Sequence, residues 1–156
     1  MTTISFKAPT VAYTAYLTTE LNALDGDAET TVLGAAIDNE TNLCMYMDLE
    51  LTLASLNLSA TVNPTVPIYL IESIDGGTDF DSAASTATAS LFPPPDKICC
   101  QFNLRLAAGA EAKLAVQTLI PIPPGRFKLM LSNKTGVDFG ATLNTLYYRT
   151  YNLQIV

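Results

Sequence analysis

The chain has 156 residues, a formal net charge of −7 at pH 7, and neither histidine nor tryptophan. Its length fits one ordinary domain, and 49% hydrophobic residues suffice for a core without metal or disulfides. The missing histidine removes the commonest general base and metal ligand, the acidic balance disfavours nucleic acid as a partner, and no apolar run is long enough for a membrane span or signal peptide. We expect a soluble, cytoplasmically made protein that is not an enzyme and needs no cofactor.

The first half of the chain shows the two-residue alternation of β-strands, each with one buried and one solvated face. It predicts strands at residues 11–17, 31–37, 45–58 and 68–71. Within 45–58 the apolar residues occupy odd positions up to Leu53 and even positions from Leu56. A shift of one residue turns every side chain to the other face, so this change predicts a β-bulge at Ala54 and Ser55.

The second half continues the pattern, with strands predicted at residues 100–106, 114–120, 127–131 and 151–155. Residues 107–113 tolerate a helix, but the stretch is short and Gly109 interrupts it. About eight short antiparallel strands with long connections predict an all-β, single-domain antiparallel β-sandwich of the jelly-roll type. We assign residues 1–16 to an N-terminal segment, a candidate extended contact arm, and residues 17–156 to the jelly-roll domain.

Two groups of carboxylates allow a functional and a structural interpretation. Asp75, Asp79 and Asp81 lie in the segment DGGTDFD, where alternating carboxylates beside glycines suit calcium. The spacing of an EF-hand is absent, which favours a solvated hairpin turn. Asp48 and Glu50 project from one face of a predicted strand. They are a hydrolase pair only if a cleft encloses them, and a solvated strand face is the simpler interpretation.

The three cysteines include an adjacent pair, Cys99 and Cys100, which cannot form an ordinary unstrained bridge with each other. No CxxC or zinc spacing occurs. In a reducing cytoplasm we therefore predict that all three thiols remain unpaired.

Charge and composition are unusual in two ways. Only 15% of the residues are charged, while 19 alanines and 20 threonines supply a quarter of the chain, so the surface consists largely of small neutral groups suited to packing against other proteins. Residues 1–96 carry a net charge of −12 and residues 97–156 carry +5. Either strands of both halves interleave in one sandwich, or an acidic and a basic pole meet across subunits.

Five segments, taken in order, resemble the jelly-roll capsid cement (decoration) proteins of tailed bacteriophages. They are LTTELNAL from Leu17, AIDNETNL from Ala36, DLELTLASL from Asp48, IYLIESIDGG from Ile68 and IPIPPGRFKLMLSNKTG from Ile120. The resemblance covers residues 17–151 and includes no catalytic motif. It implies a homo-oligomer, dimer or trimer, on the outer surface of the virion capsid that bridges subunits of the major capsid protein.

Exposed aromatic residues are the candidates for the capsid interface, and they are Tyr13, Tyr16, Phe80 and Phe92, each of which is alternatively a core residue. Two other functions remain open. A tail or host-adhesion module would bind surface carbohydrate, although the absence of tryptophan counts against it. An enzyme on a β-sandwich is weakened by the missing histidine and by the lack of a catalytic motif.

Overall fold

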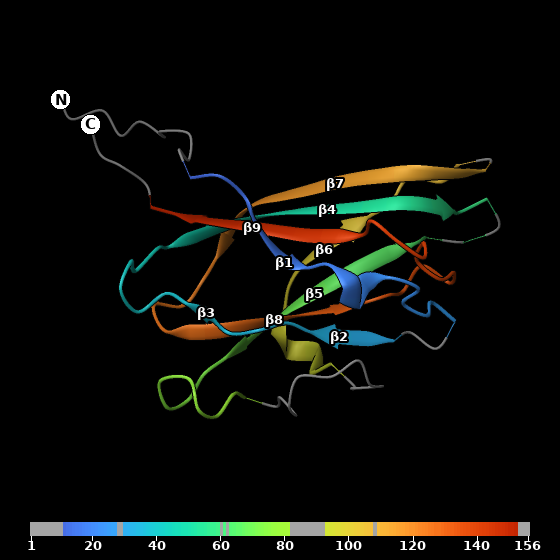
Figure 1. Cartoon of the computed structure of the whole chain (residues 1–156). Helices are drawn as coiled ribbons and strands as arrows, with labels where there is room; N and C mark the ends of the chain where they lie inside the picture. Colours follow the sequence, from blue (N-terminus) through green and yellow to red (C-terminus); the bar gives the residue numbers. More distant parts are fainter. Residues whose placement is uncertain are drawn as a thin grey trace.

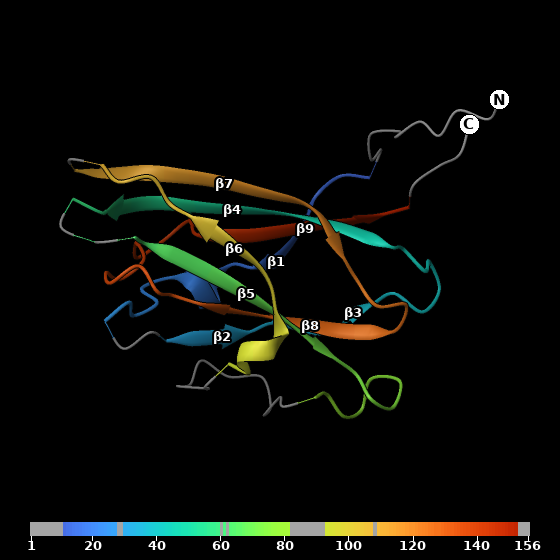
Figure 2. The ribbon, with the colours of Figure 1, turned by 180° about the vertical axis from the view of Figure 1, so that it is seen from behind.

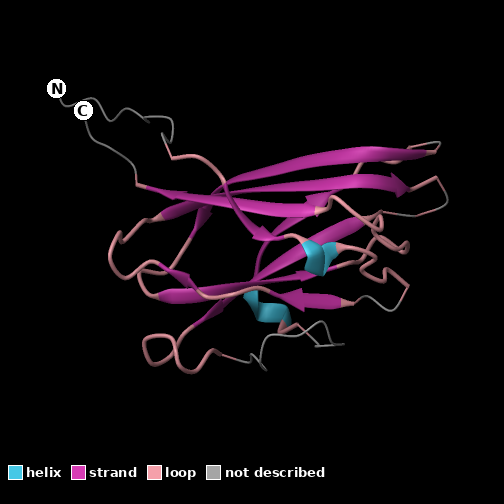
Figure 3. Cartoon of the chain, viewed as in Figure 1, coloured by secondary structure: helices cyan, strands magenta, loops and turns pink. Residues whose placement is uncertain are grey.

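The computed structural model describes residues 11–27, 30–59, 61, 63–81, 93–107 and 109–152. Within them the chain forms nine β-strands and two short 3₁₀ helices (Figures 1 and 3). In chain order these are β1 (Thr14–Leu17), η1 (Thr19–Leu21), β2 (Thr31–Leu33), β3 (Ile37–Asp38), β4 (Tyr46–Asn57), β5 (Thr65–Glu72), η2 (Pro95–Lys97), β6 (Ile98–Asn103), β7 (Ala110–Pro121), β8 (Arg126–Ser132) and β9 (Thr145–Tyr151).

The strands form two antiparallel sheets that pack face to face, which confirms the all-β sandwich (Figures 1 and 2). The first sheet has the order β1-β9-β4-β7, and the second has the order β2-β8-β5-β6 with the short β3 also on β8. The pairing is nested: β5 pairs with β6, β4 with β7, β2 and β3 with β8, and β1 with β9. Because β1 and β9 are antiparallel neighbours, the described chain begins and ends at the same end of the sandwich.

The core lies between the sheets and follows the alternation of the sequence. On β4 the side chains of Met47, Leu49, Leu51 and Leu53 are buried, and on β8 Phe127 and its alternate neighbours face them. Burying each such side chain contributes about 1.5–3 kcal/mol, so this shared layer is the main stabilising element of the fold.

The predicted bulge is confirmed. Leu53 pairs with Lys113 and Leu56 pairs with Glu111, so β4 has one residue more than β7 in this interval. The extra residue reverses the alternation and keeps Leu56 and Leu58 in the core, with 2% and 0% of their surface exposed.

The charge halves interleave. Each sheet contains strands from both sides of residue 96, and four of the ion pairs join the halves. These pairs are Asp81–Lys97, Asp38–Arg126, Glu40–Arg126 and Asp48–Arg149. The acidic and the basic half of the sequence are therefore joined within one sandwich and do not form separate units.

Several boundaries differ from the prediction. Residues 31–37, predicted as one strand, form the two strands β2 and β3. The last described strand is Thr145–Tyr151, whereas the sequence predicts residues 151–155, of which 153–155 lie outside the described residues. Of the helix-tolerant residues 107–113, residues 110–113 are the start of β7. Residues 14–16 belong to β1, in which Thr14 and Ala15 pair with β9, so the proposed arm at residues 1–16 cannot include them, and residues 1–10 lie outside the described residues.

Deletion of Ala54 tests the bulge. The deletion removes the extra residue, so Leu53, Leu56 and Leu58 fall into one unbroken alternation opposite a regular β7 ladder and stay in the core. We therefore expect the deletion to lower the free energy of unfolding, measured by urea denaturation, by much less than Leu56→Ala, which truncates a buried leucine and should cost about 2–5 kcal/mol. Ser55→Ala, at an exposed position of the same bulge, is the matched control and should change it by less than about 0.5 kcal/mol. A deletion variant as unstable as Leu56→Ala would mean that the extra residue is not the one that reverses the alternation.

Candidate interaction face

The outer faces of the two sheets are covered differently. On the second sheet Leu33, Tyr69, Ile71 and Met130 form a small buried cluster of their own, against which Phe80 packs. On the first sheet no described element lies over the outer side (Figures 1 and 2). Among the described residues, no strand or helix therefore covers the outward side of the first sheet.

The strand register defines this surface. Tyr46, Glu50 and Thr52 of β4 lie opposite Tyr151, Tyr147 and Thr145 of β9, and Val116 and Leu114 of β7 lie opposite Glu50 and Thr52. We call these eight residues the open face. Leu114 is 69% exposed and Val116 is 47% exposed, so apolar surface lies unburied along β7. The rings of Tyr46 and Tyr151 stack with their centroids 6.1 Å apart.

A buried carboxylate lies between the outward residues of β4 and β9. Asp48 is only 2% exposed. Its Oδ2 lies 2.9 Å from Nε and 2.8 Å from Nη2 of Arg149, and its Oδ1 accepts hydrogen bonds from the Tyr151 hydroxyl at 2.8 Å and the Leu119 N–H at 3.1 Å. The prediction of a solvated strand face is therefore wrong for Asp48, while Glu50 is half-buried.

A bulge in β7 brings the Leu119 amide to this carboxylate. Met47 pairs with Ile120 and Leu49 pairs with Gln117, so β7 has an extra residue opposite Asp48. Leu119 has a positive φ of 59°, a backbone conformation that residues other than glycine seldom adopt. The amide hydrogen bond to Asp48 offsets the cost of that conformation.

Tyr13, a predicted interface residue, lies on this network. The guanidinium Cζ of Arg149 is 4.5 Å from the centroid of its ring, within the range of a cation–π contact. Burial raises the pKa of Tyr13, and burial together with the hydrogen bond to Asp48 raises the pKa of Tyr151 to about 12. Both phenols therefore stay protonated and neutral at neutral pH, Tyr151 within the open face and Tyr13 beside it.

Tyr16 ties the two sheets together. Its hydroxyl accepts a hydrogen bond from the Leu129 N–H at 2.8 Å and donates one to the Ala35 carbonyl at 2.7 Å, and burial raises its pKa. Gly34 lies against the ring, where an added Cβ would come within 2.3 Å of ring carbons. Of the two interpretations of Tyr16 that the sequence left open, the structure favours the core residue over the exposed aromatic.

Phe80 does not join the open face. It is half-buried on the outer side of the second sheet, and the Lys128 ammonium lies 4.2 Å from its ring centroid. Phe92 lies outside the described residues. Of the three predicted aromatics that the structure describes, only Tyr13 lies on the outward side of the first sheet.

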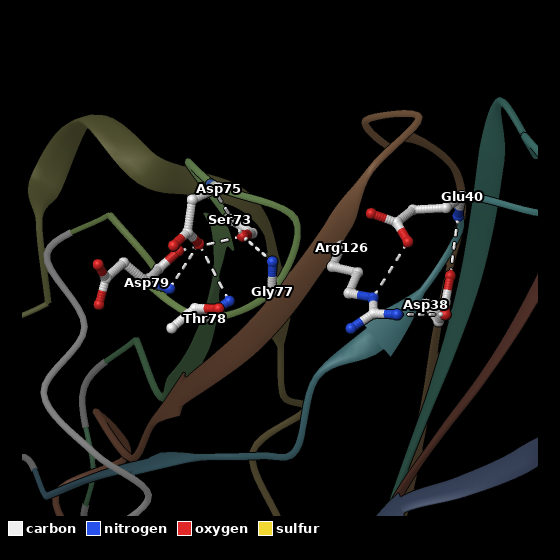
Figure 4. A network of polar contacts seen from close by, with 8 residues as sticks. All are labelled: Asp38, Glu40, Ser73, Asp75, Gly77, Thr78, Asp79 and Arg126. Atoms are coloured by element: carbon white, nitrogen blue, oxygen red, sulfur yellow. Dashed lines mark hydrogen bonds and ion pairs between the residues drawn. The ribbon is translucent and has the colours of Figure 1, made fainter.

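The Asp75 segment is a hydrogen-bonded turn (Figure 4). Oδ1 of Asp75 accepts from the N–H groups of Thr78 and Asp79 at 3.0 and 2.6 Å, and the Ser73 Oγ accepts from the Gly77 N–H at 2.6 Å. Asp81 instead forms an ion pair with Lys97. Among the described residues no group of three His, Cys, Asp or Glu side chains is placed to hold a metal, so the structure favours the turn over the calcium site.

Arg126, at the start of β8, lies between this loop and the carboxylates of Asp38 and Glu40 (Figure 4). Its Nη2 lies 3.2 Å from Oδ2 of Asp38, and its Nε lies 3.3 Å from Oε2 of Glu40 without the geometry of a hydrogen bond. Gly77 has a φ of +109°, and an added Cβ would come within 2.5 Å of Cδ of Arg126. Glycine is therefore required at this position both by its backbone conformation and by the close side chain.

Comparison with known proteins places no relative beside this chain: no family model, curated protein or solved structure matches it. In the described part of the chain, no helix has the length and apolar character to cross a membrane.

The open face contains residues that sequence reasoning did not select. Tyr46, Tyr147, Tyr151, Leu114 and Val116 lie at outward positions of their strands. The sequence TLYYRTY at residues 145–151 carried a signal for the tyrosines, because Tyr147 and Tyr151 both lie among its alternate, outward positions. Tyr148 on the inward side obscured that alternation.

Removing the positive partner of Asp48 should destabilise the fold strongly. Arg149→Met leaves a buried carboxylate without its ion pair, and we expect a loss of about 3–5 kcal/mol in the free energy of unfolding, measured by urea denaturation. Arg105→Met removes the ion pair with Glu111 at a side chain that is 77% exposed, and this control should cost less than about 1 kcal/mol. Equal losses in the two variants would show that Asp48 is effectively solvated.

Tyr151 should make the protein sensitive to alkali. Its pKa is raised from the usual 10.0 to about 12 in the folded protein, so its stabilising contribution is complete below pH 10 and is lost as the pH rises toward 12. We expect the free energy of unfolding, measured by urea denaturation between pH 8 and pH 11.5, to fall less steeply in Tyr151→Phe than in the wild type. Identical slopes would mean that the Tyr151 hydroxyl is not held by Asp48.

Proposed function

We propose that the protein is a structural virion protein that binds the outside of a tailed-phage head as a homo-oligomer and stabilises the capsid by bridging subunits of the major capsid protein. The open face carries this proposal, because it is a broad, uncovered sheet surface with exposed leucine and valine and several tyrosines. Tyrosine offers a large contact area at little conformational cost, which makes it frequent in protein interfaces.

The topology supports the fold that the resemblance implies. The nested pairs β5–β6, β4–β7, β2/β3–β8 and β1–β9 follow from one long antiparallel ribbon rolled into two sheets. If β2 and β3 are counted as one interrupted strand on β8, the sandwich has eight strands, the number of a jelly roll. On this pairing we propose that the sandwich is a jelly roll.

The packing of the open face suits a protein that acts in many copies. Its strands are fixed by the core beneath them and by the Asp48–Arg149 pair, so little conformational freedom is lost on docking. An oligomer that contacts several shell subunits gains avidity from geometry, without high affinity at each contact. Added to a finished shell, it stabilises that state by mass action.

The stacked rings of Tyr46 and Tyr151 favour a second candidate, a tail or host-adhesion module that binds surface carbohydrate. Such a module would use the same face, but its ligand would be a sugar of the host envelope. The two candidates differ in what the protein binds, and one set of variants separates them.

Val116→Glu and Leu114→Glu place a charge on the open face without touching the core. We expect each to reduce binding to purified heads of the encoding phage at least tenfold, measured by co-sedimentation, while the melting temperature stays unchanged. Ile74→Glu is the matched control, because Ile74 is 73% exposed but lies in the loop after β5 and not on the open face. This variant should bind to heads like the wild type. Heads carrying the wild-type protein should retain their genome to higher temperature than bare heads, at low and at high salt.

Three outcomes would overturn the proposal. Bare heads that are equally robust would exclude a cementing function, and heads that never assemble without the protein would make it a shell-building component. Binding to host envelope instead of heads, lost in the same two variants, would establish the adhesion module.

A further inference from the structure

Cys99 and Cys100 occupy a further bulge, in the edge strand β6. Ile68 of β5 pairs with Cys100, whereas the next residue of β5, Tyr69, pairs with Ile98. Cys99 is therefore an extra residue on β6. In a regular strand two successive side chains point to opposite faces, but the extra residue of a bulge places both on one side.

The burial of β6 agrees with that geometry. Ile98 and Gln101, on either side of the pair, are exposed, whereas both cysteines are half-buried and pack against the main core. All three cysteines of the chain are unpaired, as predicted, and Cys44 lies elsewhere, with its amide bound to Asn39. The bulge thus creates a convergent dithiol from two neighbouring residues.

One hydrogen bond fixes the position of the Cys99 side chain. Its thiol donates to the carbonyl oxygen of Ile68, with the Sγ 3.4 Å from the oxygen. Ile68 is also the residue that pairs with Cys100, so both cysteines lie against the same residue of β5. A thiolate is the form that binds a metal.

Cys99 is accessible from outside. It lines an open groove of about 580 Å³ at the start of β6, together with the end of β5, η2 and residues 121–123. No other strand of the described chain pairs with the free edge of β6, although β7 lies beside it in the opposite sheet. A small ion can reach the Cys99 sulfur from this groove, and Cys100 is its neighbour in the bulge.

We propose that Cys99 and Cys100 form a two-thiolate binding site for a soft, low-coordinate metal ion of the class of Cu(I). Thiolates select soft ions, and a structural zinc site needs four ligands. Among the described residues no third His, Cys, Asp or Glu joins the pair. Binding replaces two S–H protons by two metal–sulfur bonds: Cu(I) and two thiols give an anionic dithiolate complex and release two protons, with no change of oxidation state.

The test uses the reduced full chain under anaerobic conditions, with Cu(I) supplied in competition with a chromophoric Cu(I) chelator. We expect one tightly bound Cu(I) per chain, and native mass spectrometry gives the stoichiometry. Cys99→Ser and Cys100→Ser should each weaken binding at least tenfold, whereas Cys44→Ser should bind like the wild type. Bound Cu(I) should also raise the melting temperature, because it stabilises the folded state.

A urea-unfolded sample separates a site built by the fold from two cysteines that are merely neighbours in sequence. The folded chain should bind Cu(I) at least tenfold more tightly than the unfolded chain. Equal affinity in both states, or unchanged affinity in Cys99→Ser and Cys100→Ser chains that melt like the wild type, would overturn the proposal.

Discussion

Strand β4 is the constraint on which the rest of the sandwich depends, because it is paired on both edges and must satisfy two different faces at once. Its inward residues supply the centre of the core, while on the outward side Asp48 is buried and needs a positive partner from β9 and an amide from β7. Breaking a buried ion pair is more costly than the net gain from forming it, so the pair acts mainly to fix register. A slip of β9 or β7 along β4 would leave the carboxylate without partners.

The interleaving of the two halves of the chain follows from the same topology. Nested pairing places the first and last strands side by side, so neither half contains a complete sheet. The acids of the first half and the bases of the second meet as ion pairs within one domain. On the open face, threonine, tyrosine, leucine and valine side chains predominate, with Glu50 as the one charged member. That composition, and not an extreme of charge, gives the open face its character.

The sequence predicts most of the strands and the bulge at Ala54 and Ser55, because both depend on a two-residue alternation that any buried strand must keep. It misplaces the last strand, where Leu146 and Tyr148 on the inward side and Tyr147 and Tyr151 on the outward side make both faces look apolar. The burial of Asp48 depends on groups from two other strands, and the role of Tyr16 depends on a gap left by Gly34 in the opposite sheet. Which sheet stays uncovered is set by the packing of the Phe80 segment, a tertiary property that no local pattern contains.

The position of the two chain ends has a mechanical consequence. Since β1 and β9 are antiparallel neighbours whose outer ends leave the sandwich at one pole, tension applied between the ends separates the two strands like a zipper, one hydrogen bond after another. β1 has only four residues, so its ladder opens at low force. Load carried across the faces of the sheets instead compresses the close-packed core, which resists deformation. The molecule therefore resists compression between two surfaces better than it resists tension between β1 and β9.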